Sequence, residues 1–343
     1  MSTPDSPLVR YIAVHRLFKV YVAGPLGLLT VVTSKKSTKG KGKGQGQGQA
    51  TTTSRRPSPA EQQTLAKFNL SLWKFTTYGF FTTLGLWVVH DEPYLRNPTL
   101  FWSAWASPMA ADHRLLYLLE LAYYLYDVPA LLFFESKRKD FLVMVVHHLA
   151  TIILIAGSLM GGFHKVGVTI IILPSVKYHN LIIRLVEYHG APFFFNPVNS
   201  HSHSRPHPHP PYHPHPGDFL KVGVTIMVLH DVCDVFLEAA KVLKYTCKHT
   251  GRSEFWVDRL FEVFVVVWVA MRDVYFPFWV IRSCLTEAEK LVVPQGGSGL
   301  GVRLFTALLC VLQVLHVWWT YLIARIAYRQ IVHGVVDDDR EDD

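Results

Sequence analysis

Two segments of this chain carry ionisable side chains inside long apolar stretches. In residues 141–160, His147 and His148 stand next to each other. In residues 219–242, the string VLHDVCDVFLEAAK carries a second set: His230, Asp231, Asp234, Glu238 and Lys241. Ionisable groups are costly inside a membrane-spanning helix, so they mark either a functional site, the default hypothesis, or a structural polar network.

The spacing of the second set favours a shared helical face. Steps of three, four and three residues from Asp231 to Lys241 place four side chains on one stripe of a helix. An imidazole can take up a proton near neutral pH or accept an acyl group, and a nearby carboxylate can fix its tautomer and stabilise the cation. Two histidines on one helix and two aspartates on another therefore favour a reaction centre over a purely structural hydrogen-bonding role.

The same residue types are also metal ligands. Membrane di-iron enzymes need several HxxxH or HxxHH clusters, so that enough imidazoles converge on two irons. Neither spacing occurs in the apolar segments of this chain. Adjacent histidines on a helix point about 100 degrees apart and rarely share one ion. We therefore predict no metal site.

The composition predicts a membrane protein. Of the 343 residues, 50% are hydrophobic and 17% are charged, against about 25% charged in soluble domains. The apolar residues form blocks of about twenty, the length that crosses a bilayer. Six blocks predict spanning helices: 70–89, 115–134, 141–160, 219–242, 257–281 and 302–324. A seventh block, 8–32, carries three cations and could lie flat on the interface, but we predict that it spans. The expected fold is an all-α, polytopic membrane protein.

The basic residues gather in alternate loops. With seven spans, one side of the membrane receives the C-terminal tail and the basic loops 33–69, 135–140 and 243–256. The opposite loops, 90–114 and 282–301, hold only four Lys and Arg residues. Loops rich in Lys and Arg stay in the cytosol, so we expect a cytosolic C-terminus. The excess of 34 Lys and Arg over 26 Asp and Glu thus lies between spans, which argues against nucleic-acid binding.

Composition also divides the chain into parts. Residues 1–33 hold the N-terminal helix, and 34–66 form a basic flexible linker around GKGKGQGQGQ. Residues 67–325 form the main domain, with a His/Pro-rich insertion at 164–219, and 326–343 form an acidic cytosolic tail.

A repeated hexapeptide marks the insertion. KVGVTI occurs at 165–170 and again at 221–226, and only the second copy continues into the charged motif. Between them, HSHSRPHPHPPYHPHP has alternating prolines that prevent a helix. Its histidines could hold a transition metal, but we favour a segment without fixed structure, because low complexity provides no fixed ligand geometry.

The charged motifs resemble those of a known family. FFESKRKDFLVMVVHHLATIILIAGS, continued after the insertion by FLKVGVTIMVLHDVCDVFLEAAKVLKY, is similar to the signature motif of the ceramide synthases in the TLC domain family. The likeness extends to KFNLSLWKFTTYGFFTTLGLWVVHDEPY and to YFPFWVIRS. It implies that residues 67–325 fold as a six-helix TLC bundle in the endoplasmic reticulum membrane, with the N-terminal spanning helix outside it.

The resemblance also implies an activity. A ceramide synthase transfers a fatty acyl group from acyl-CoA, its co-substrate, to the amine of sphinganine, phytosphingosine or sphingosine, without a cofactor. The implied catalytic residues are His147, His148, Asp231 and Asp234. The implied substrate-binding residues are His230, Glu238, Lys241, Lys137, Arg138 and Lys139.

Each binding role has an alternative. The three cations of the basic turn would attract the phosphates of acyl-CoA from the cytosol, or they serve only as positive-inside anchors. Glu238 and Lys241 would contact substrate or form a structural ion pair. Non-enzymatic lipid-sensing and translocation-associated TLC proteins lack the complete His and Asp set, which this chain has. Expected partners are membrane lipids and the two substrates, with a homo- or heterodimer left open.

Overall fold

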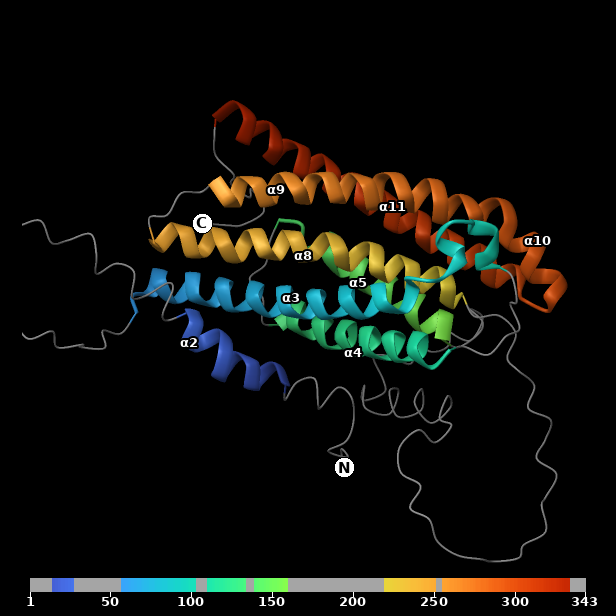
Figure 1. Ribbon diagram of the computed structural model, residues 1–343, viewed down its shortest axis with the longest axis horizontal. Coiled ribbons are helices and arrows are strands. Elements are labelled where there is room, and N and C mark those ends of the chain that lie inside the picture. The colour runs from blue at the N-terminus through green and yellow to red at the C-terminus, as the bar shows by residue number, and fades with distance from the viewer. Residues whose placement is uncertain are drawn as a thin grey trace, which may run out of the picture. The chain divides into compact units, whose positions relative to one another are not determined.

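The computed structural model describes residues 14–27, 57–102, 110–133, 139–159, 219–250 and 255–333 (Figure 1). These residues are mostly helical and contain no strand. The chain divides into two compact units by its internal contacts. The first contains Met1–Tyr11, Asp91–Thr225 and Phe278–Leu315, and the second contains Ile12–His90, Ile226–Pro277 and His316–Asp343.

Each of the six blocks predicted between residues 70 and 324 coincides with a helix in the part of the chain that the structure describes. The long helices are α3 (Pro59–Val89), α4 (Ala111–Phe133), α5 (Phe141–Leu159), α8 (Leu220–Thr250) and α11 (Gly299–His333). The fifth block lies in a continuous helix, Phe255–Gln295. It consists of α9 (Phe255–Trp268), the π-helices η6 (Val269–Ile281) and η7 (Cys284–Ala288), α10 (Glu289–Val292) and the 3₁₀ turn η8 (Val293–Gln295).

The predicted loop at 282–301 is wrong over most of its length. The helix continues through it to Gln295, because Cys284, Ala288 and Val292 recur every four residues and are all buried. The helix ends at Gly296, whose φ of 89° is a left-handed conformation that glycine adopts without strain.

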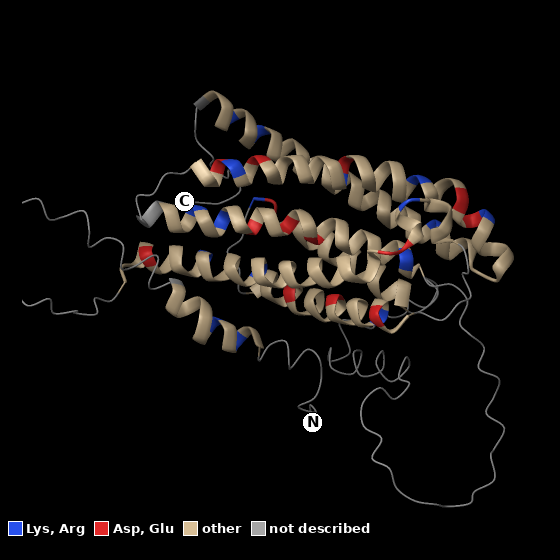
Figure 2. Cartoon of the chain, viewed as in Figure 1, with Lys and Arg blue, Asp and Glu red and all other residues tan. Residues whose placement is uncertain are grey.

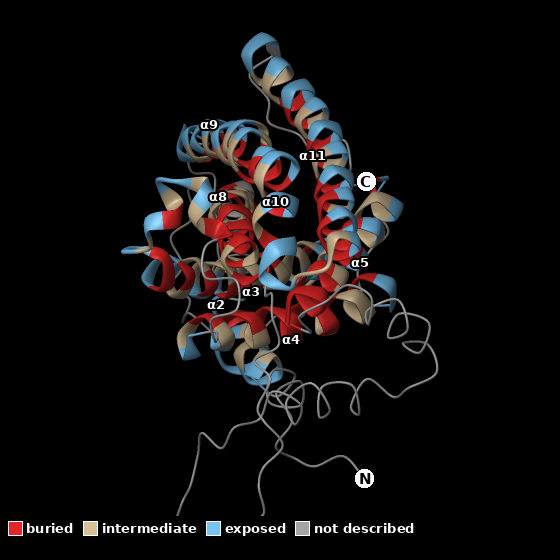
Figure 3. Ribbon diagram, turned by 90° about the vertical axis from the view of Figure 1, so that its right-hand side faces the viewer, coloured by how far each residue is buried: buried red, intermediate tan, exposed pale blue. Residues whose placement is uncertain are grey.

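Four helices are long and apolar enough to cross a membrane by length and composition: Ala111–Phe133, Phe141–Leu159, Phe255–Gln295 and Gly299–Val332. Helices α3 and α8 are not among them. Thr, Trp and Tyr lower the hydropathy of α3, and Figure 2 shows charged residues along α8, acidic ones in its middle. Figure 3 shows exposed residues along one side of α11, many of them apolar. The chain is thus a multi-pass membrane protein, and the count of six spans stays a prediction.

Helix α3 begins inside the predicted 34–66 linker. Ser58 and Glu61 form a capping box, in which the Glu61 N–H donates to Ser58 Oγ and the Ser58 N–H donates to Glu61 Oε2 at 2.8 Å. Pro59 occupies the first helical turn, where its missing N–H does no harm. These local signals start the helix well before the apolar block does.

The N-terminal helix packs on α3 within the second unit. Residues 14–27 are helical, including the π-helix η1 (Lys19–Ala23) and α2 (Gly24–Gly27). The rings of His15 and Phe18 lie 4.4 and 5.2 Å from that of Trp73. The rest of the predicted 8–32 span lies outside the described residues, so its crossing of the membrane stays a prediction.

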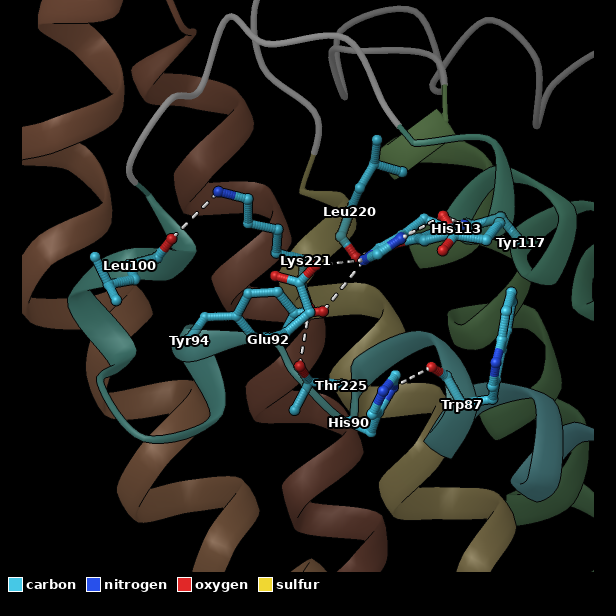
Figure 4. A network of polar contacts seen from close by, with 11 residues as sticks. Trp87, His90, Glu92, Tyr94, Leu100, His113, Tyr117, Leu220, Lys221 and Thr225 are labelled. Carbon is cyan, nitrogen blue, oxygen red and sulfur yellow. Dashed lines mark hydrogen bonds and ion pairs between the residues drawn. The ribbon is translucent and has the colours of Figure 1, made fainter.

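In the first unit, α4 packs against α5, and the beginning of α8 packs against α4 (Figure 4). The Tyr117 hydroxyl donates to Leu220 O at 3.2 Å, and Lys221 Nζ donates to Leu100 O at 3.4 Å. A Cβ on Gly223 would lie 1.7 Å from the Tyr117 hydroxyl oxygen. A larger residue at this position would require the Tyr117 side chain or the helices to shift.

The insertion predicted at 164–219 lies outside the described residues, except for its last residue. Phe219 stacks on Phe305 with ring centroids 4.3 Å apart. The acidic tail beyond His333 also lies outside the described residues.

Candidate active site

The histidine pair lies on α5 in the first unit, and its second member contacts a buried carboxylate. His148 Nε2 lies 2.8 Å from Asp127 Oδ2 on α4, and the two side chains are 5% and 6% exposed. The Tyr124 and His148 rings also pack edge to face, with ring centroids 5.6 Å apart. This contact joins the two helices through polar groups inside an apolar environment.

Both nitrogens of His148 are engaged. Its Nδ1 lies 2.7 Å from the Met144 carbonyl oxygen, which can only accept, so Nδ1 carries a proton. Nε2 faces Asp127, so one further proton lies between the ring and the carboxylate. Whichever partner carries it, the contact fixes the orientation of the His148 ring.

His147 points in a different direction from His148. The two rings are nearly perpendicular, at 87°, with centroids 5.7 Å apart, and His147 is buried. The Thr151 hydroxyl donates to the His147 carbonyl oxygen at 2.9 Å, so all three defined positions of the HHxxT motif lie within one region of α5. The pair thus provides one imidazole held by Asp127 and a second beside it.

In the second unit, Asp234 of α8 forms an ion pair with Arg272 of η6. Arg272 Nη2 donates to Asp234 Oδ1 and to the His230 carbonyl oxygen, each at 3.0 Å. The Arg272 side chain is 4% exposed, against 23% for Asp234. Its guanidinium carbon lies 4.2 Å from the centre of the Trp268 ring, which is a cation–π contact.

The remaining residues of the predicted stripe are also buried or partly buried. Lys241 Nζ donates to Glu238 Oε1 at 2.8 Å, which gives an ion pair within α8. Asp231 is 2% exposed. Of the two roles considered for Glu238 and Lys241, this contact matches the structural ion pair.

His230 takes part in a second imidazole contact. Its Nδ1 lies 2.7 Å from the Ile226 carbonyl oxygen, so Nδ1 carries a proton. Its Nε2 lies 3.0 Å from Nε2 of His316 on α11. Two nitrogens at this distance share one proton, and the Phe276 ring covers both imidazoles.

The structure therefore distributes the predicted site residues over two sets of contacts. His147 and His148 lie in the first unit, whereas His230, Asp231, Asp234, Glu238 and Lys241 lie in the second. Lys139 is exposed, and Lys137 and Arg138 lie outside the described residues. Within the part of the chain that the structure describes, no group of three or more His, Cys, Asp or Glu residues could hold a metal ion.

Three ionisable residues that contact this set within the described structure were not predicted: Asp127, Arg272 and His316. Each is an ionisable residue within an apolar segment, in the strings YLYDVPALL, VAMRDVYFP and VLQVLHVWW. The rule that such residues are costly and functional applies to them equally. Applying it to every apolar block, instead of to two, would have found them.

These helices and their buried polar contacts define a multi-pass membrane protein with ionisable groups inside its apolar segments. The TLC domain family matches residues 67–176 and 216–325. The chain belongs to this family. The match leaves out residues 177–215, a shorter segment than the predicted insertion at 164–219, whose bounds stay a prediction.

Several curated relatives share most of this chain. It is 29% identical to ceramide synthase LOH2 of Arabidopsis thaliana over 83% of this chain and 76% of the relative. It is 31% identical to ceramide synthase 5 of Homo sapiens over 81% of this chain and 55% of the relative. Ceramide synthase hyl-1 of Caenorhabditis elegans is 28% identical over 79% of this chain and 59% of its own length.

Proposed function

We propose that this chain is a ceramide synthase, an enzyme that transfers a fatty acyl group from acyl-CoA to the amine of a sphingoid base. The observation that carries the proposal is the buried imidazole pair His147 and His148, with Asp127 bonded to the second imidazole. The similarity to curated ceramide synthases over most of the chain supports the same activity.

We propose different roles for the two histidines, and the contacts of His148 support this proposal. Because both of its ring nitrogens are engaged, His148 is a positioning group that Asp127 orients. We assign the reacting imidazole to His147. As the amine nitrogen attacks the thioester carbonyl, His147 takes the amine proton and a C–N bond forms. The C–S bond then breaks, and the CoA thiolate leaves with the proton that His147 returns.

The aspartates of α8 are the second proposed set of catalytic residues. Asp234 is held by Arg272, which keeps its carboxylate in one orientation. Asp231 is buried three residues earlier on the same helix. Glu238 and Lys241 neutralise each other, and we assign them a structural role within α8.

The remaining parts of the proposal concern location and substrates. We propose six spans in the TLC domain, a seventh at the N-terminus, and a cytosolic C-terminus in the endoplasmic reticulum membrane. Acyl-CoA is a co-substrate, and no cofactor takes part. The exposed Lys139, at the end of the basic turn, would attract the phosphates of acyl-CoA.

The test is an assay of microsomes from cells that lack their own ceramide synthases. Microsomes with the wild-type chain are given a sphingoid base and a panel of acyl-CoAs, and ceramide is measured. The expected result is ceramide with the wild-type chain and none with His147→Ala at equal expression. A matched control is Val146→Ala, an exposed neighbour on α5, which should retain activity.

Absence of ceramide with every acyl-CoA from the folded wild-type chain would contradict the proposal. It would instead favour a non-enzymatic TLC protein. If the wild-type chain is inactive, deletion of residues 164–219 distinguishes two explanations. Activity would return if the insertion disables the enzyme, and it would stay absent in a non-enzymatic TLC protein.

A further inference from the structure

The last helix contacts the residues that hold Asp234, although none of the predicted site residues lies on it. Within the second unit, Trp268 of α9 donates its indole N–H to the Thr320 hydroxyl of α11 at 2.8 Å. Trp268 is buried, and its ring face lies against the guanidinium of Arg272, four residues further along the same helix. Arg272 in turn donates to Asp234. Three successive contacts thus lead from Thr320 to Asp234.

The Thr320 hydroxyl is arranged to accept the indole N–H. Its oxygen lies 2.8 Å from Asp273 Oδ2 and 2.9 Å from the His316 carbonyl oxygen. The carbonyl oxygen can only accept a hydrogen bond, and so can the carboxylate when it is ionised. The single hydroxyl proton is therefore donated to one of them, which leaves the oxygen lone pairs for Trp268. A buried indole N–H needs such a partner, so the hydroxyl selects one orientation of the Trp268 ring.

The orientation of that ring matters for Arg272. A guanidinium is attracted to the face of an indole and not to its edge. Arg272 makes its contacts to Asp234 and to the His230 carbonyl through one nitrogen, Nη2. If the indole turned, the guanidinium would lose the surface on which it lies, and these two hydrogen bonds would lose their geometry.

We propose that Thr320 is a positioning residue for Asp234 and acts through Trp268 and Arg272. The inference rests on the proposed function, in which Asp234 is a catalytic residue. In this role Thr320 acts on Asp234 and not on the substrate, so its loss should lower turnover and leave the KM for acyl-CoA nearly unchanged.

The experiment compares two substitutions that separate the hydroxyl from the methyl group. Thr320→Val keeps the shape and loses the hydroxyl, whereas Thr320→Ser keeps the hydroxyl and loses the methyl group. We expect Thr320→Val to lower kcat about fivefold, the usual effect of one hydrogen bond, with Thr320→Ser close to wild type. A packing role predicts the reverse order, because only the serine variant leaves a void. That order, or wild-type kcat in Thr320→Val, would overturn the inference.

Two further variants locate the effect. Trp268→Phe removes the same hydrogen bond from the other side, so it should lower kcat, and combining it with Thr320→Val should add nothing more. If Thr320→Val does not fold, Trp268→Phe alone tests the inference. Asp273→Ala removes one of the two acceptors of the hydroxyl proton and leaves the His316 carbonyl oxygen as the other, so kcat should fall less than in Thr320→Val. Additive losses, or an equal loss in Asp273→Ala, would contradict the route through Trp268.

The wild-type chain separates failure of the inference from failure of the function. An active wild-type enzyme with an unaffected Thr320→Val variant overturns only the role of Thr320. A folded wild-type chain that forms no ceramide overturns the proposed function, and the positioning role with it.

Discussion

Two buried polar pairs among the described residues, His148 with Asp127 and Asp234 with Arg272, are held in different ways. In the first unit, His148 and Asp127 share a proton across α4 and α5, and the second imidazole nitrogen is held by a backbone carbonyl. In the second unit, Asp234 faces a guanidinium, which stays charged at all pH values of interest and lies on the Trp268 ring. The first pair holds the His148 ring beside His147, the proposed reacting imidazole, whereas the second is a fixed ion pair. This difference predicts that substitutions in the first pair mainly affect turnover and that substitutions in the second also affect stability.

The largest expected effect is on stability in the second unit. Arg272→Ala should destabilise the fold by about 3 kcal/mol, because it leaves the Asp234 carboxylate without its cation in a largely buried position. To measure the loss, the detergent-solubilised protein is heated, and the folded protein that remains is quantified by size-exclusion chromatography. Arg272→Lys keeps the positive charge, so its thermal stability should lie between that of wild type and that of Arg272→Ala. Equal thermal stability of wild type and Arg272→Ala would show that the ion pair does not hold this unit.

In the first unit, the largest expected effect is on turnover. Asp127→Asn keeps the size of the side chain but removes the carboxylate that orients the His148 ring beside the proposed reacting imidazole of His147, so kcat should fall about 100-fold. Thermal stability should change much less than in Arg272→Ala, since an amide can still hydrogen-bond the imidazole. The two measurements together test the contrast. The contrast would be contradicted if Asp127→Asn lost thermal stability while its remaining folded fraction kept the wild-type kcat.

Helix contact near the start of α8 gives a smaller and purely structural effect. Gly223→Ala should destabilise by about 1–3 kcal/mol, because the new methyl group would overlap the Tyr117 hydroxyl and force the side chain or helix to move. The matched control is Gly79→Ala, since a Cβ on Gly79 meets nothing within 4 Å. That control should be neutral or slightly stabilising. Equal thermal stability of both variants would mean that α4 and α8 approach less closely.

The smallest expected effect lies at the start of α3 in the second unit. Ser58→Ala removes the side-chain oxygen that accepts the Glu61 N–H, which should destabilise by about 1 kcal/mol. Ser58→Asp keeps an acceptor at the cap and should restore the stability. Thermal unfolding again provides the measurement, and equal losses in the alanine and aspartate variants would argue against the capping box.

Periodicity and composition predicted each long helix because apolar blocks of about twenty residues have few alternatives in a membrane. The boundaries were less predictable. Helix α3 starts at a capping box that precedes its apolar block. The helix from Phe255 continues to Gln295 because Ala288 and Val292 stay on its buried side. Local signals outside the apolar blocks therefore determine where α3 begins and where the helix from Phe255 ends.

The candidate site was predictable where a motif concentrated its residues. His147 and His148 are adjacent, and the acidic residues of α8 follow one another at helical spacing, so each of these two patterns was visible. Asp127 and Arg272 stand alone among apolar residues, and their partners come from other helices. Pairing across helices depends on rotation and depth within the fold, which sequence spacing on one helix does not contain.

The most direct test of the central claim is a stoichiometric assay with the purified full-length chain in phospholipid nanodiscs. The protein is given one acyl-CoA and sphinganine, and both dihydroceramide and free CoA are measured by mass spectrometry. The account predicts one CoA for each dihydroceramide with the wild-type chain and neither product with His147→Ala. Equal dihydroceramide formation by His147→Ala, or release of CoA without dihydroceramide by the wild-type chain, would contradict it.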